Sequence, residues 1–312
     1  MITLVLYQAL YFCNNHLLIG ILLAVMNFFL GPLNPLVDSW IIENVAGEKN
    51  ISYGNIRIWG CVGFAATAYL LGISIAANSL DVIFPAFALL VILTAGFCIR
   101  IDHKKVTTSL AIKELKVSKL FKNYNYTSFL IFATLFFIPL ISCESFFPEL
   151  LSFMGGDSKS LGLSYAVCSL SEVPIFFLCT YLLRKHKPLK LILVASICYL
   201  LRQFLYLVAF QPNHLILIQI IQGVSFGIFL SSALYYIDSM SPPELKATSQ
   251  TVFGALYYGI TGIAGNYLGG AITQKTGLLS MYKFSFIASF VVLIIFVISL
   301  QMKRKRYKIR AV

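Results

Sequence analysis

Charged side chains are scarce in this sequence of 312 residues, since Asp, Glu, Lys and Arg together make up 12% of it. Soluble domains typically carry about twice that share, which covers their surface with solvated groups. Hydrophobic residues, in contrast, make up 59% of the chain. This composition excludes a water-soluble globular protein and predicts an all-α integral membrane protein that crosses the bilayer several times.

The chain also lacks the residue spacings that bind metals, form disulfides or support covalent catalysis. Its seven cysteines all lie in apolar runs without paired spacing, and its four histidines lie in polar connectors. No phosphate-binding glycine loop and no nucleophile–base pair is present in the sequence. We therefore expect no metal site and no cofactor, we expect that the protein is not an enzyme, and we interpret the cysteines as small packing residues.

Acidic residues are half as numerous as basic ones, and the net charge is +12. Nearly all Lys and Arg residues lie in polar connectors or at the C-terminus, whereas a nucleic-acid-binding protein carries them on a solvated face. If successive connectors alternate between the two sides of a membrane, 20 of the 24 basic residues fall on one side. Because cytoplasmic loops are enriched in Lys and Arg, we expect a multi-pass protein of the plasma membrane with a cytoplasmic C-terminus and no nucleic-acid partner.

The apolar runs indicate how many helices cross the membrane. A helix needs roughly 20 apolar residues to span the hydrocarbon layer. A run at residues 1–13 is too short for this, and we interpret it as the second part of a helix whose beginning is missing. Nine runs are long enough, at residues 17–45, 56–77, 82–100, 125–152, 160–183, 189–210, 213–240, 247–273 and 279–301.

The longest polar connector, residues 101–123, separates four of these runs, one of them partial, from six complete ones. Secondary transporters are often built from two repeated helical halves. We therefore predict helices three to twelve of a twelve-helix plan, and an upstream extension that encodes two more spans. The predicted divisions are an incomplete N-terminal half at 1–100, a cytoplasmic linker at 101–123, a six-helix C-terminal half at 124–302 and a basic cytoplasmic tail at 303–312.

Four ionisable residues lie inside apolar runs, where a charge is costly and by default marks a functional site. They are Asp38, Glu144, Glu172 and Arg202. Glu172 and Arg202 lie near the middles of consecutive runs, so the sequence predicts that they pair inside the bundle. Such a pair either binds substrate or protons or only fixes helix packing, and both interpretations stay open.

Polar and small residues form further patterns inside the apolar runs. Asn34 lies one turn before Asp38, after a Gly-Pro interruption that frees backbone carbonyls. Gln219 and Gln222 fall on one face of a later run, where glutamine either contacts substrate or ties helices together. The glycine-rich stretch 254–270 predicts close helix packing.

The stretch 54–63 (GNIRIWGCVG) resembles the start of the fifth helix in the oligosaccharide–proton symporters of the major facilitator superfamily, typified by lactose permease. The second half is more similar to the phenylpropionate and nucleoside permease branch of that superfamily. There, residues 171–174 (SEVP) resemble an eighth-helix Glu-x-Pro motif, Leu201-Arg202 resembles the arginine of the ninth helix, and 241–248 (SPPELKAT) resembles the loop before the eleventh helix.

The resemblance implies a major facilitator fold with two helical-bundle halves, and it implies site residues. Glu172 is the first candidate for the proton carrier and Glu144 the second. The sequence also departs from lactose permease, because Gln222 and Ser225 stand roughly where that permease has a histidine and a carboxylate used in proton coupling. The implied substrate-binding residues are Arg57, Asp38, Asn34, Arg202 and Gln222.

Composition and resemblance together predict a secondary active transporter, namely a proton-coupled symporter of a small polar or aromatic metabolite such as a sugar, a nucleoside or an aromatic acid. Its expected partners are this small-molecule substrate, protons and the lipid bilayer, and we expect a monomer. Two alternatives stay open: an exporter of drugs or metabolites on the same fold, and an inactive truncated permease.

Overall fold

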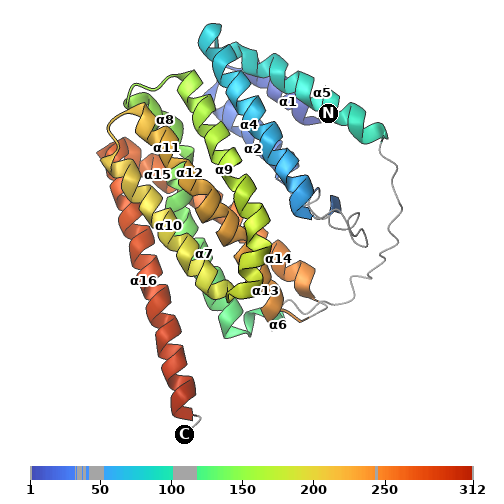
Figure 1. The fold of residues 1–312 in the computed structure, drawn as a ribbon. Helices are drawn as coiled ribbons and strands as arrows, with labels where there is room; N and C mark the ends of the chain where they lie inside the picture. The colour runs from blue at the N-terminus through green and yellow to red at the C-terminus, as the bar shows by residue number, and fades with distance from the viewer. Residues whose placement is uncertain are drawn as a thin grey trace.

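The computed structural model describes residues 2–31, 33, 37, 40–41, 53–100, 118–242 and 245–310. These residues form a helical bundle, as the composition predicts, and its two halves lie side by side (Figure 1). Seven helices in the described ranges are long and apolar enough to cross a membrane, and each overlaps a predicted run. They are Ile56–Ala77, Leu80–Arg100, Tyr124–Ser145, Ser158–Lys185, Pro188–Val208, Pro212–Met240 and Leu278–Met302.

The first half contains short helices as well as membrane-length ones. The short helix α1 (Ile2–Tyr11) packs on α5 (Ile83–Arg100). The Gln8 side-chain amide donates a hydrogen bond to the Phe84 carbonyl at 2.8 Å, and the Tyr7 ring lies 4.3 Å from the Phe87 ring. Asn15 caps the next helix by accepting from the Leu17 N–H. The elements are α1 (Ile2–Tyr11), α2 (His16–Leu30), α4 (Tyr53–Ala77), the 3₁₀ turn η1 (Leu80–Val82) and α5 (Ile83–Arg100).

The second half begins with a helix that is shorter than the sequence predicts. The predicted run 125–152 is two helices, because Phe146 leaves the regular helical conformation and Pro148 begins a new helix without needing an amide donor. The first elements of this half are α6 (Ser118–Phe121), α7 (Tyr124–Ser145), α8 (Phe147–Phe153), α9 (Ser158–Lys185) and α10 (Pro188–Val208).

Two of the remaining predicted runs, 213–240 and 247–273, each contain a π-helical segment in the structure. The first run comprises α11 (Pro212–Ile218), α12 (Ile220–Gln222), the π-helix η2 (Gly223–Gly227) and α13 (Ile228–Met240). The second comprises α14 (Lys246–Gly254), the π-helix η4 (Ala255–Ile260) and α15 (Thr261–Thr276), and α16 (Leu278–Arg310) follows it.

The large hydrophobic clusters of the described residues lie in the second half. Their centre is aromatic: the Phe137 ring lies 5.4 Å from Tyr199, 4.7 Å from Phe229 and 4.6 Å from Tyr257. Aromatic pairs at such distances stabilise a core beyond the area that they bury. The second half therefore has a well-packed core that holds the polar groups among its helices in place.

Close helix packing accounts for only some of the glycines in the stretch 254–270. A Cβ atom on Gly265 would lie 2.6 Å from the Ile138 carbonyl of α7, and the Ser142 hydroxyl donates to the Gly265 carbonyl at 2.6 Å. Close packing of α15 on α7 is therefore confirmed at this point. Gly254, Gly259 and Gly262, however, have no atom within 4 Å of such a Cβ, so the predicted packing role is wrong for them.

The two halves meet along α4 and α9, which form the most extensive helix pair among the described elements (Figure 1). A Cβ atom on Gly72 would lie 2.8 Å from the Gly162 Cα atom, so the two backbones touch at this end. Further along the pair, the Ser169 hydroxyl donates to the Cys61 carbonyl at 2.9 Å. We call this contact between α4 and α9 the seam, and Glu172, one of the candidate site residues, lies at it.

Candidate functional site

Arg202 is the centre of a buried polar cluster in the second half. It lies within α10 and is 5% exposed, although α10 is a membrane-length helix. Its Nε–H donates to the Tyr206 hydroxyl at 2.8 Å, and its Nη2 donates to Gln219 Oε1 at 3.2 Å. Its Nη1 donates to Glu144 Oε1 at 3.2 Å and also to Gln222 Oε1. Four acceptors thus surround a guanidinium that has five N–H donors.

The elements of the second half bring these acceptors together from three directions. Tyr206 follows Arg202 by one helical turn and therefore lies on the same face of α10. Gln219 and Gln222 come from the span that begins at Pro212, and Gln219 also donates to the Tyr206 hydroxyl at 3.1 Å. Glu144 comes from the last turn of α7. The predicted glutamine stripe is therefore confirmed as one face that points at the arginine.

The ion pair of Arg202 is with Glu144, at 3.2 Å. The sequence-based prediction that Arg202 pairs with Glu172 is wrong. Glu144 lies in the last turn of α7, and the packing of α7 against α10 places it within reach of Arg202. The Glu144 side chain is 40% exposed while the Arg202 side chain is 6% exposed, so the carboxylate is the accessible member of the pair.

Glu172 instead lies at the seam between the halves. Its Oε2 is 3.8 Å from the Cys61 sulfur of α4, and Arg57 lies one turn before Cys61 on α4. The seam therefore brings the Glu172 carboxylate of the second half against Cys61 of the first half, on the helix that also carries Arg57.

The π-helix η2 lets the glutamine-bearing span approach α9 closely. The Gly223 N–H donates to the Ser171 hydroxyl at 2.9 Å, and a Cβ atom on Gly223 would collide with the Ser171 carbonyl. Because Ser171 and Glu172 are adjacent, this contact fixes Glu172 relative to Gln222. Single-turn π segments inside α-helices frequently occur at functional sites.

Asn34 and Asp38, which were predicted to bind substrate, lie outside the residues that the structure describes. Sequence reasoning missed Tyr206 as a partner of Arg202 and treated Cys61 only as a packing residue. The signal for Tyr206 was present, since a hydroxyl one turn after a buried arginine shares its helix face. Within the described ranges, no group of three or more His, Cys, Asp or Glu residues could hold a metal ion.

A helical bundle of two halves, with ionisable groups inside membrane-length helices and at the seam, defines a membrane transport protein. The sequence matches the MFS_1 like family over residues 1–284, so the chain belongs to that family, which is part of the major facilitator superfamily. The major facilitator fold predicted from the sequence is confirmed.

Two bacterial transporters are similar to this chain in sequence. The maltose permease of Geobacillus stearothermophilus is 24% identical over 293 residues, which are 94% of this chain and 74% of the permease. The uncharacterized transporter YwbF of Bacillus subtilis (strain 168) is 24% identical over 260 residues, which are 81% of this chain and 63% of YwbF.

Solved structures of the nucleoside transporter NupG share the fold. A single-residue mutant of NupG superposes with a TM-score of 0.79 at 19% identity, and the unaltered protein with a TM-score of 0.78 at 18% identity. Each comparison covers 95% of this chain and 80% of the NupG chain.

Proposed function

We propose that the chain is a secondary active transporter that moves a small hydroxylated solute, a sugar or a nucleoside, across the membrane together with a proton. The observation that carries this proposal is the Arg202 cluster, in which a carboxylate and two amides surround one guanidinium inside membrane-length helices. Polar groups of this kind in a membrane interior mark substrate and proton pathways.

The chemistry of the cluster suits hydroxyl groups. Glu144 is the accessible member of the ion pair, and a carboxylate accepts hydrogen bonds from hydroxyls, while the amides of Gln219 and Gln222 both donate and accept. Maltose and nucleosides, after which the similar permease and the transporter NupG are named, are solutes of this class. Substrate contacts are proposed for Arg57, Asn34, Asp38, Arg202 and Gln222.

Glu172 is the proposed proton carrier. It lies at the contact between α4 and α9, where a movement of one half against the other changes its surroundings, and a coupled proton requires a group whose environment differs between two states. Glu144 is the second candidate, because its protonation would remove the charge that pairs with Arg202.

Solute counterflow in proteoliposomes tests the transport proposal. Vesicles that contain the purified chain and a high internal concentration of unlabelled uridine or maltose should transiently accumulate the same labelled solute from outside. Protein-free vesicles and a panel of aromatic acids and amino acids are the controls. Accumulation of only the aromatic acids would contradict the substrate class, and no counterflow with any solute would contradict the transport proposal itself.

A further inference from the structure

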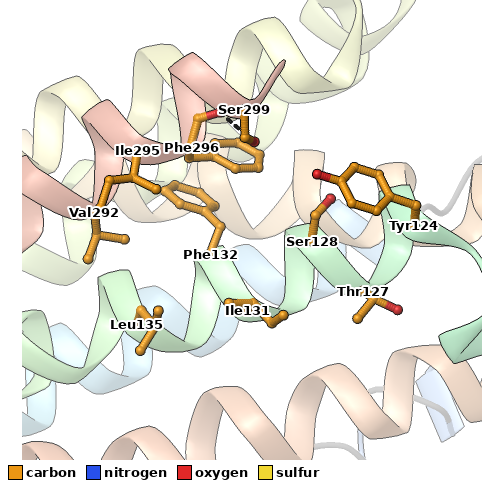
Figure 2. A pocket seen from close by; sticks show the side chains of 10 residues that line it. All are labelled: Tyr124, Thr127, Ser128, Ile131, Phe132, Leu135, Val292, Ile295, Phe296 and Ser299. Atoms are coloured by element: carbon orange, nitrogen blue, oxygen red, sulfur yellow. Dashed lines mark hydrogen bonds between the residues drawn. The ribbon is translucent and has the colours of Figure 1, made fainter. Parts of the chain in front are cut away.

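A groove lies between α7 and α16, and none of the residues that line it belongs to the polar site (Figure 2). Its volume is about 270 Å³. The stacked rings of Phe132 and Phe296, whose centroids are 3.9 Å apart, lie in its wall and are nearly fully buried. Ile131 and Ile295, in contrast, are 55% and 61% exposed, so the groove opens toward the surroundings of the bundle.

One end of the groove is polar. Tyr124, Thr127 and Ser128 line it from α7, and Ser299 lines it from α16, whereas Leu135 and Val292 line the other end (Figure 2). The Thr127 and Ser299 hydroxyls donate to backbone carbonyls at 2.9 and 3.0 Å. The groove thus changes from apolar to polar along its length, as a phospholipid does between its acyl chains and its glycerol.

Basic residues begin where the polar end finishes. Lys122 is exposed and precedes Tyr124 by two residues. On the other wall, α16 continues past Ser299 to Arg310, and Lys303 follows Ser299 after about one helical turn. The segment 303–310 contains six Lys or Arg residues and no acidic residue. Clusters of Lys and Arg beside a membrane helix attract anionic lipids.

We propose that this groove binds one anionic phospholipid, with an acyl chain along Ile131, Leu135 and Ile295 and the phosphate at the end where the basic residues begin. The leaflet is the one that the Lys and Arg distribution predicts to be cytoplasmic. A second copy of the chain is a poorer occupant, because its own segment 303–310 would bring six more positive charges to the same place.

Native mass spectrometry of the delipidated full chain, titrated with phosphatidylglycerol or phosphatidylcholine, tests the proposal. We expect at least threefold stronger retention of one phosphatidylglycerol molecule. Ile295→Trp fills the groove and should lower this retention to the phosphatidylcholine level. Ile197→Trp is the matched control, since Ile197 is 59% exposed on α10, and it should leave retention unchanged. Equal retention of the two lipids, or equal losses in the two variants, would overturn the proposal.

Charge variants test the headgroup part separately. Lys303, Arg304, Lys305 and Arg306, replaced together by Gln, should abolish the preference for phosphatidylglycerol while the melting temperature stays unchanged. The control replaces the four basic residues at the α9–α10 turn, and it should keep the preference; they are Arg184, Lys185, Lys187 and Lys190. A preference that survives the first set would contradict the proposal, and so would a lipid-free dimer that Ile295→Trp dissociates, because the occupant would then be a second copy.

Discussion

Arg202 shows how a charge is kept inside a membrane bundle. Isolated, a buried guanidinium would cost many kcal/mol, and breaking a buried pair typically costs about 3–5 kcal/mol. Here Tyr206, Gln219, Gln222 and Glu144 accept four of its hydrogen bonds. The planar fork of arginine matches these divergent acceptors, whereas the ammonium group of lysine is a compact point charge.

We therefore predict that Arg202→Lys lowers both stability and solute affinity. Lysine has three N–H donors for the four acceptors on Tyr206, Gln219, Gln222 and Glu144. At least one acceptor is therefore left without a donor, at a cost of about 1–3 kcal/mol where that group is buried. Arg184→Lys is the control, because Arg184 is exposed at the end of α9. Thermal unfolding in detergent and solute binding by calorimetry measure both effects. Affinity within twofold of the original in Arg202→Lys would assign this arginine to packing alone.

A substitution at Glu172 tests whether this residue carries the coupled proton. We predict that Glu172→Gln abolishes accumulation against a gradient but leaves counterflow exchange, because an amide keeps hydrogen bonding and cannot carry a proton. Glu149→Gln is the control, since Glu149 is an exposed carboxylate in α8. Uptake of labelled solute with and without an imposed pH gradient separates the two activities. Accumulation that persists in Glu172→Gln would remove the proton role from this residue.

At the scale of elements, the sequence predicted where helices lie better than how they face one another. The cost of a charge in an apolar run is a local property, so Glu144, Glu172 and Arg202 could be identified without coordinates. The choice of Glu144 as the partner of Arg202 could not, because it depends on how α7 and α10 pack in space. The break between α7 and α8 at Phe146 could not be identified either. An apolar pattern that continues from α7 into α8 carries little sign of that break except Pro148.

The α4–α9 seam gives a prediction at this scale. Gly72→Trp should force the two helices apart, because even a Cβ atom there would lie 2.7 Å from the Ser158 carbonyl and 2.8 Å from the Gly162 Cα atom. Cys61, which is 6% exposed in the seam, should then react severalfold faster with a maleimide. Gly96→Trp is the control, since a Cβ atom at Gly96 has no neighbour within 4 Å.

The readout for the seam variant is the rate of modification at Cys61, followed by peptide mass spectrometry so that the other cysteines do not contribute. An unchanged rate in Gly72→Trp, in a protein that still unfolds cooperatively, would show that the seam does not control access to Cys61.

On the scale of the whole molecule, the described parts of the two halves differ in how much hydrophobic core they contain. The hydrophobic clusters lie in the second half, and the described part of the first half has four buried hydrophobic residues: Met26, Ile41, Cys61 and Ala65. Rocking of the halves about a central site is the general mechanism of transporters with this architecture. Because Glu172 contacts Cys61 across the seam, such a movement would change the surroundings of the proposed proton carrier.

The central claim, that solute and proton cross together, is tested most directly by solute-driven proton movement. Proteoliposomes with a weakly buffered medium and a pH electrode or an external pH dye receive a pulse of uridine or maltose without any imposed proton gradient. Coupled entry of solute and proton predicts an alkaline shift of the medium that a protonophore abolishes and that Glu172→Gln lacks. Solute entry measured in the same vesicles with no change of external pH would contradict the account.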